Sequence, residues 1–131
     1  MKATYRTLAI GIFMLIVSAS NAQTKDESCF ELFNQLGTEK FDDGKYQQAI
    51  YLFEAALRCV DKKDEETVKL QMKKSTDCIK FMQKADDKIN SGRYDAAKTF
   101  YAAIINLNPK DKFVMNQIKL CDDKISEAVN E

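Results

Sequence analysis

The feature that most constrains the fold of this chain is a two-part pattern that occurs twice along it. In each copy, apolar residues recur every three or four positions, a short turn with a central glycine follows, and a second apolar run begins. Such spacing places the apolar residues on one face of a helix, and a short turn between two such helices makes an antiparallel hairpin. The first arms contain Phe33, Gly37 and Phe41 in one copy and Phe81, Ala85 and Ile89 in the other, before turns at 43–46 and 91–94.

The second arms and the C-terminal segment continue this self-similarity. A third, partial copy lies at 121–125, where Cys121 takes the position of Ala85. We predict an all-α fold of about two helical hairpins and a capping helix over 112–129, since terminal repeats are often atypical. In the second arms, Ala97, Phe100, Tyr101, Ile104 and Ile105 match Ala49, Leu52, Phe53, Ala56 and Leu57, and Pro109 ends the later arm.

Composition supports this fold class and excludes several functions. The 131 residues include one proline and four glycines, which suits long helices with short turns. Lys+Arg and Asp+Glu are 20 each, so the chain lacks the basic surplus of nucleic-acid-binding proteins. The sequence contains no histidine, which removes the commonest general base and transition-metal ligand.

The repeated pattern resembles the tetratricopeptide repeat, whose signature is W-x2-L-G-x2-Y, then A-x3-F, then P. The resemblance covers about 29–125, although phenylalanine replaces tryptophan and lysine fills the tyrosine slots. It implies a short α-α superhelix in a domain over 23–131, of the type exported to Gram-negative envelopes, with repeats at 29–60 and 78–109. The slots hold Phe33, Leu36, Gly37, Lys40, Ala49, Phe53 and Asp61 in the first copy, and Phe81, Lys84, Ala85, Lys88, Ala97, Tyr101 and Pro109 in the second.

A surplus segment at 61–77 separates the two copies. Gly44 and Gly92 lie 48 residues apart, whereas the family repeat is about 34 residues long. Asp64, Glu65 and Glu66 are typical of an N-cap and first helical turn, and apolar residues continue at helical spacing. We expect a helical insert, either as a lengthened first arm or as a separate short helix.

Residues 1–22 have the pattern of a secretory signal peptide. Lys2 and Arg6 precede an apolar run from Leu8 to Val17, and small residues end at Ala22. Ten apolar residues are too few for a membrane span, which needs about 20. We therefore predict cleavage before Gln23 and export to the periplasm or the cell exterior, where disulfides can form.

The four cysteines allow several pairings. We predict a Cys59–Cys78 disulfide that closes the insert, with Cys29–Cys59 as the alternative. A long unbroken helix over 64–90 would carry Cys78 out of reach of Cys59. Cys121 sits in a small-residue slot and is expected to be a buried apolar residue.

We find no sequence signal for catalysis, a metal or a cofactor, and predict that the protein is not an enzyme. The acid pairs 42–43, 86–87 and 122–123 are expected to be solvated, because neighbouring residues in a helix point in different directions. The cysteines lack CxxC spacing, which argues against both zinc and redox chemistry.

The family resemblance implies a partner-binding groove lined by the first arms. We predict that this groove holds a segment of another protein, which makes the chain a scaffold or adaptor without nucleic-acid partners. A self-assembling structural module of the envelope is the alternative. The positions carried over are Glu31, Asn34, Thr38, Phe41 and Asp42 from the first copy, and Ile79, Met82, Asp86, Ile89 and Asn90 from the second.

Overall fold

The structure is a computed structural model that describes residues 17–59 and 62–130, with side chains from residue 28 onward except 62 and 63. These residues form five α-helices and no strand, which confirms the predicted all-α fold of helical hairpins. Residues 1–16, most of the predicted signal peptide, lie outside the described part. None of the described helices is long and apolar enough to cross a membrane. The helices are α1 (Val17–Asp42), α2 (Tyr46–Leu57), α3 (Lys62–Asn90), α4 (Tyr94–Leu107) and α5 (Lys112–Val129).

The two glycine turns have the same geometry, as their repeated sequence predicts. Gly44 and Gly92 have φ values of 74° and 71°, a left-handed conformation that glycine adopts without the steric cost of a Cβ. The residue after each glycine closes the preceding helix: Lys45 N donates to Lys40 O, and Arg93 N donates to Lys88 O, both at 2.8 Å. Each first arm is thereby turned back into its second arm.

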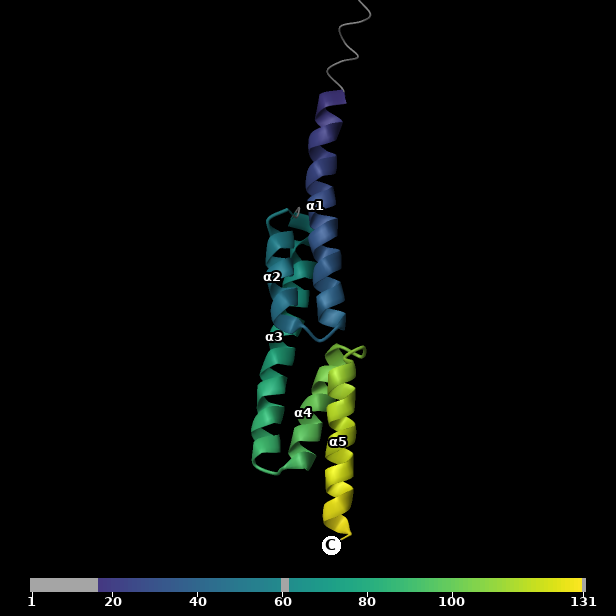
Figure 1. Cartoon of the computed structure of the whole chain (residues 1–131). Helices are drawn as coiled ribbons and strands as arrows, with labels where there is room; N and C mark the ends of the chain where they lie inside the picture. Colours follow the sequence, from purple (N-terminus) through teal and green to yellow (C-terminus); the bar gives the residue numbers. More distant parts are fainter. Residues whose placement is uncertain (1–16, 60–61, 131) are drawn as a thin grey trace, which may run out of the picture.

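The insert lengthens the first arm of the second hairpin. α3 is a single helix of 29 residues, about 44 Å long at 1.5 Å per residue. Its first half packs against α2 and its second half against α4. The α4–α5 hairpin is consequently displaced along α3, and Figure 1 shows its turn meeting the turn of the α1–α2 hairpin near the middle of the molecule.

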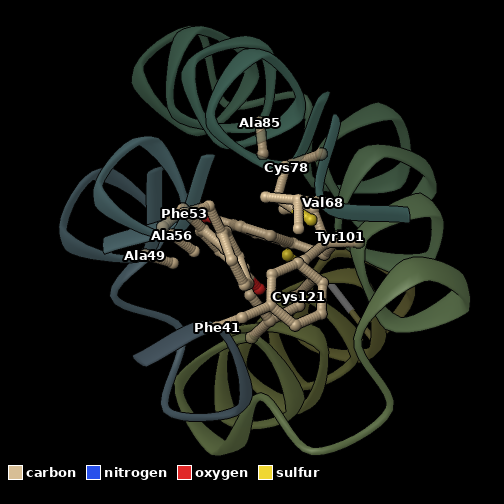
Figure 2. Packing of buried hydrophobic residues seen from close by; sticks show 13 residues of the cluster. Phe41, Ala49, Phe53, Ala56, Val68, Cys78, Ala85, Tyr101 and Cys121 are labelled. Carbon is tan, nitrogen blue, oxygen red and sulfur yellow. The ribbon is translucent and has the colours of Figure 1, made fainter. Parts of the chain in front are cut away.

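The buried core runs through both halves of the molecule (Figure 2). Small residues let the helices approach closely, as expected: a Cβ on Gly37 would lie 2.7 Å from the ring of Phe53. Phe53 is fully buried, which contributes about 2–3 kcal/mol of hydrophobic free energy. The other fully buried apolar residues include Ala49, Ala56, Val68, Cys78, Ala85, Ala97, Ile104, Val114 and Cys121.

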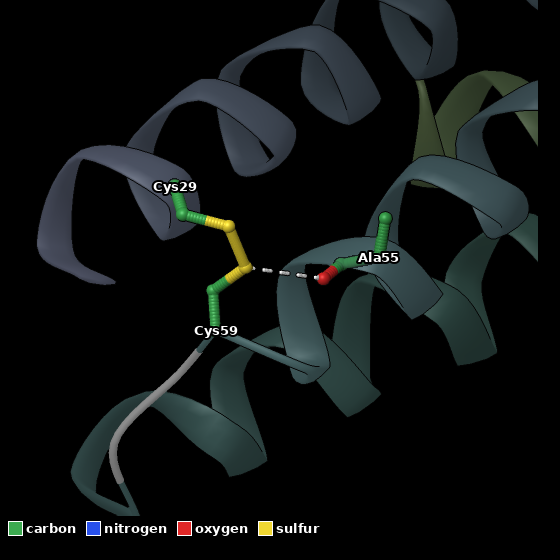
Figure 3. The surroundings of a disulfide bond; sticks show 3 residues. All are labelled: Cys29, Ala55 and Cys59. Atoms are coloured by element: carbon green, nitrogen blue, oxygen red, sulfur yellow. Dashed lines mark hydrogen bonds between the residues drawn. A yellow bond between two sulfur atoms is a disulfide. The ribbon is translucent and has the colours of Figure 1, made fainter. Parts of the chain in front are cut away.

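The structure corrects the favoured disulfide and supports the alternative. Cys29 on α1 is bonded to Cys59 in the turn after α2, with Cα atoms 5.8 Å apart (Figure 3). The predicted Cys59–Cys78 bond is wrong, because Cys78 lies about four turns along the unbroken α3 and is buried as a free thiol. Cys121 is fully buried, as predicted. The Cys29–Cys59 bond is consistent with an oxidising compartment.

Candidate functional site

A surface cleft of ≈ 340 Å³ opens where the α1–α2 turn and the start of α2 meet the middle of α3. The α3 side supplies Ile79, Met82 and Gln83, one helical turn apart. The other side is the continuous segment 44–48, which includes Lys45 and Tyr46. The lengthened α3 makes this cleft possible. The helix continues past the α1–α2 turn, and the space between that turn and the side of α3 stays open.

The cleft combines apolar side chains with a polar rim. Ile79 and Met82 are half-buried, whereas Lys45, Gln47 and Gln48 are exposed. Lys45 Nζ lies 3.6 Å from Asp43 Oδ2, and an exposed ion pair of this kind contributes little to the free energy of folding. Its ammonium group is therefore free to turn toward an occupant, and the glutamine amides can both donate and accept hydrogen bonds.

Beneath the cleft, four buried residues connect the two hairpin turns, and we call this group the junction: Phe41, Tyr46, Asn108 and Asp111. The Tyr46 hydroxyl donates to Asp111 Oδ2 at 2.5 Å, and Asn108 Nδ2 donates to the carbonyl oxygen of Phe41 at 2.6 Å. Asp111 Oδ1 also accepts from the backbone N of Val114 at 3.0 Å, which caps the N-terminus of α5. Every polar side chain of the junction is thereby satisfied despite its burial.

Burial sets the ionisation behaviour of the junction and of the thiol next to it. It raises the pKa of Tyr46 far above its ordinary value, and the hydrogen bond to Asp111 raises it further. Burial also raises the pKa of the Cys78 thiol to about 11, with hydrogen bonding to Tyr46 offsetting part of the rise. Both groups stay protonated near neutral pH. Since a thiolate is the reactive form of cysteine, Cys78 lacks the activation of a nucleophile.

The second-copy residues of the predicted groove have mixed environments on α3. Ile79 and Met82 line the cleft. Asp86 accepts a hydrogen bond of 3.3 Å from the Tyr101 hydroxyl, and burial raises the pKa of Tyr101 to about 12. Ile89 packs against the core, and Asn90 is exposed at the end of α3.

The first-copy residues lie on α1, outside the cleft. Phe41 was expected to contact a partner, but it is only 7% exposed and packs edge-on against Tyr46 at 5.4 Å between ring centroids. It belongs to the core because the α4–α5 turn covers the end of α1. Asp42 forms an ion pair with Lys110 at 2.6 Å. Glu31 and Thr38 are exposed, and Asn34 is half-buried.

The acid pairs do not assemble into a metal site in the described part of the chain. No group of three or more Cys, Asp or Glu side chains there is placed to hold an ion. Asp122 instead pairs with Lys98 at 2.6 Å, which links α5 to α4.

Comparison with known proteins does not assign this chain to a family. No protein-family model, curated protein or solved structure matches this chain. The tetratricopeptide resemblance therefore stays a prediction that rests on the repeated residues, and the function has to be argued from the site.

Sequence reasoning missed most of the cleft and all of the polar junction. Asp111 directly before an apolar helical run is a recognisable N-cap signal, but its other partner, Tyr46, lies 65 residues away. Gln47, Gln48 and Gln83 are ordinary surface residues by sequence. They become part of a site only because the lengthened α3 displaces the α4–α5 hairpin from the first hairpin.

Proposed function

We propose that this chain is an exported protein-binding module of the tetratricopeptide type that holds a segment of another protein in the cleft beside α3. The observation that carries the proposal is the open apolar floor formed by Ile79 and Met82. Two half-buried apolar side chains under a polar rim are the arrangement of a peptide-docking site.

The cleft chemistry specifies the kind of segment that fits. Its volume suits one bulky apolar side chain, and the flexible thioether of Met82 adapts to the shape of that side chain. The amides of Gln47, Gln48 and Gln83 would pair with the backbone or polar side chains on either side of the anchor. Lys45 favours a carboxylate near one end. The expected ligand is therefore a short segment with one large apolar residue and a neighbouring acidic residue.

The proposed location is the periplasm or the cell exterior. The signal-like pattern of residues 1–22 predicts export, and the Cys29–Cys59 bond is of the kind that persists in oxidising compartments.

A photo-cross-linking experiment tests the cleft directly. A photoreactive amino acid placed at Gln83 should capture a discrete segment from envelope extract, and the same group at Leu70, exposed on α3 far from the cleft, should not. A synthetic copy of the captured segment is then titrated against the wild type, Met82→Glu and Leu70→Glu by fluorescence anisotropy.

We expect Met82→Glu to weaken this binding by about tenfold or more, because it places a charge where the apolar anchor docks. Leu70→Glu should leave the affinity unchanged, and replacing the apolar anchor of the peptide by alanine should reproduce the loss. Equal affinities for the wild type and Met82→Glu would exclude the cleft as the binding site.

A further inference from the structure

Exposed apolar side chains are concentrated on α5. Of the seven large hydrophobic residues exposed in the described part of the chain, four lie on this helix. Two of them, Phe113 at 57% and Leu120 at 43%, share one face, whereas Met115 and Val129 lie on other sides of the helix. Single exposed apolar residues are normal, but neighbouring ones on one face mark a candidate interaction surface. Phe113 and Leu120 are seven positions apart, so they share a face, which we call the outer stripe and which also includes Gln117 and Lys124.

The internal repeat shows what this face does elsewhere in the molecule. Leu120 corresponds to Lys84, and Gln117 to Phe81, because Cys121 corresponds to Ala85. In the second hairpin these positions contact the second arm: the Phe81 ring stacks on Phe100 of α4 at 6.5 Å, and Lys84 Nζ lies 5.7 Å from the centre of the Phe100 ring. On α3, the face that corresponds to the outer stripe packs against an antiparallel second arm, α4. On α5 this face is exposed, because α5 packs along α4 through a different face that includes Cys121 and Val114.

We propose that the outer stripe of α5 pairs with the outer stripe of a second copy of this chain. A two-fold axis perpendicular to two paired helices makes them antiparallel, which is the direction of a second arm in a hairpin. With the axis near Gln117, Phe113 of each copy faces Leu120 of the other. Each α5 supplies the arm that the other one receives, and Figure 1 shows α5 at the edge of the molecule, where a second copy can approach it.

The charges beside the outer stripe complement each other in this arrangement. Lys112 and Asp123 are exposed, lie on the same flank of the stripe and have no ion-pair partner within residues 28–59 and 64–130. They are centred near residue 117, as Phe113 and Leu120 are. The two-fold axis consequently brings Lys112 of one copy next to Asp123 of the other, twice per dimer. A parallel pairing would place like charges together, so the charge pattern selects the antiparallel register.

The interface is small, which determines the strength to expect. One helix pair lies at the low end of specific interface sizes, below about 1,200 Å² in total. We therefore expect a reversible monomer–dimer equilibrium with a dissociation constant in the micromolar range.

Sedimentation equilibrium of the purified chain, with and without charge reversal, tests the proposal. Lys112→Glu and Asp123→Lys should each raise the dimer dissociation constant about tenfold, because each creates two like-charge contacts. The double variant Lys112→Glu/Asp123→Lys should recover the wild-type value, since the two ion pairs are rebuilt with exchanged signs. Leu120→Glu should abolish the dimer, and Leu70→Glu, an exposed apolar position on α3, should leave it intact.

Recovery of the wild-type dissociation constant in the double variant would show that each single variant is folded and has lost only the interface. A single variant that had misfolded would not regain dimerisation through a second charge reversal. A wild-type chain that stays monomeric up to about 100 µM, well above the micromolar range expected for so small an interface, overturns the proposal. So does a double variant that associates as weakly as either single one. Neither outcome bears on the cleft, whose titration uses a peptide and a different face.

Discussion

Gly44 meets two structural requirements, whereas Gly92, at the same place in the repeat, meets only one of them. Both have positive φ, but a Cβ on Gly44 would lie 2.7 Å from Asp111 Oδ2, whereas a Cβ on Gly92 would meet nothing within 4 Å. Gly44 is therefore needed for its own turn and also for the close approach of the α4–α5 turn. Alanine substitutions at the two glycines therefore distinguish the free-energy cost of backbone strain, which both share, from the cost of disturbing the junction, which only Gly44 has.

We predict that Gly44→Ala destabilises the protein more than Gly92→Ala. Both variants pay about 1–2 kcal/mol for alanine in a left-handed conformation. Gly44→Ala should lose about 1–3 kcal/mol more, because the buried carboxylate of Asp111 is pushed away from its hydrogen-bond partners. Urea unfolding followed by circular dichroism measures both values. Equal losses would show that Asp111 moves aside without cost.

At this scale the sequence predicts turns better than contacts. The glycines of both turns can be recognised from the sequence because the turn depends only on the local backbone conformation. The partner of Asp111 and the burial of Phe41 depend on where the α4–α5 turn lies, and that position is set by the length of α3 rather than by any nearby residue. The repeat pattern alone therefore predicts Phe41 in the groove, whereas the structure buries it.

Among the helices, α1 depends on the disulfide more than the others do. Figure 1 shows the first turns of α1 extending past α2, and Cys29 on α1 is bonded to Cys59 just after the end of α2. Of the described helices, only α2 packs substantially against α1. The bond therefore fixes the open end of the first hairpin, opposite the Gly44 turn.

We expect reduction of the Cys29–Cys59 bond to lower the free energy of unfolding by roughly 3–4 kcal/mol, the chain-entropy value for a loop closed across 30 residues. Urea unfolding with and without reductant measures this loss. The Cys29→Ser/Cys59→Ser variant should resemble the reduced protein and should not respond to reductant. A wild-type midpoint that is insensitive to reduction would contradict a stabilising role for the bond.

The helix boundaries illustrate how far sequence periodicity reaches. The helical spacing through 61–77 predicts a helix, but it does not distinguish a lengthened first arm from a separate helix, because both have the same period. The unbroken α3 decides it. The unbroken helix also explains why the predicted Cys59–Cys78 disulfide is wrong, because the two cysteines would be close only if the chain turned between them.

The whole molecule consists of the α1–α2 and α4–α5 hairpins, which both pack along α3 and whose turns meet at the junction. Asn108 is central to this contact, since its side chain donates to Phe41 O and to the Tyr46 hydroxyl while its Oδ1 accepts from Lys110 N. These hydrogen bonds, together with the continuous core, favour unfolding of both hairpins in one step.

We predict that Asn108→Ala lowers stability by about 1–3 kcal/mol, because the buried side-chain hydrogen bonds to the Phe41 carbonyl, the Tyr46 hydroxyl and Lys110 N are lost, while the Phe41 carbonyl keeps its bond from Gly44 N. It should also reduce the dependence of unfolding free energy on urea concentration, because the two halves then begin to unfold separately. Hydrogen exchange resolved by residue should show α4 and α5 opening before α2. The exposed Asn90→Ala serves as the control, and an unchanged urea dependence for Asn108→Ala would rule out the coupling.

Tyr46 has a consequence that extends beyond stability. One side of the residue forms a wall of the cleft, and its hydroxyl holds the carboxylate that starts α5. An occupant of the cleft thus touches the residue that orients the first turn of the helix carrying the outer stripe. If an occupant shifts Tyr46 and the first turn of α5 moves with it, the free energy of the proposed helix pairing changes, and by thermodynamic reciprocity pairing changes the affinity for the occupant by the same factor.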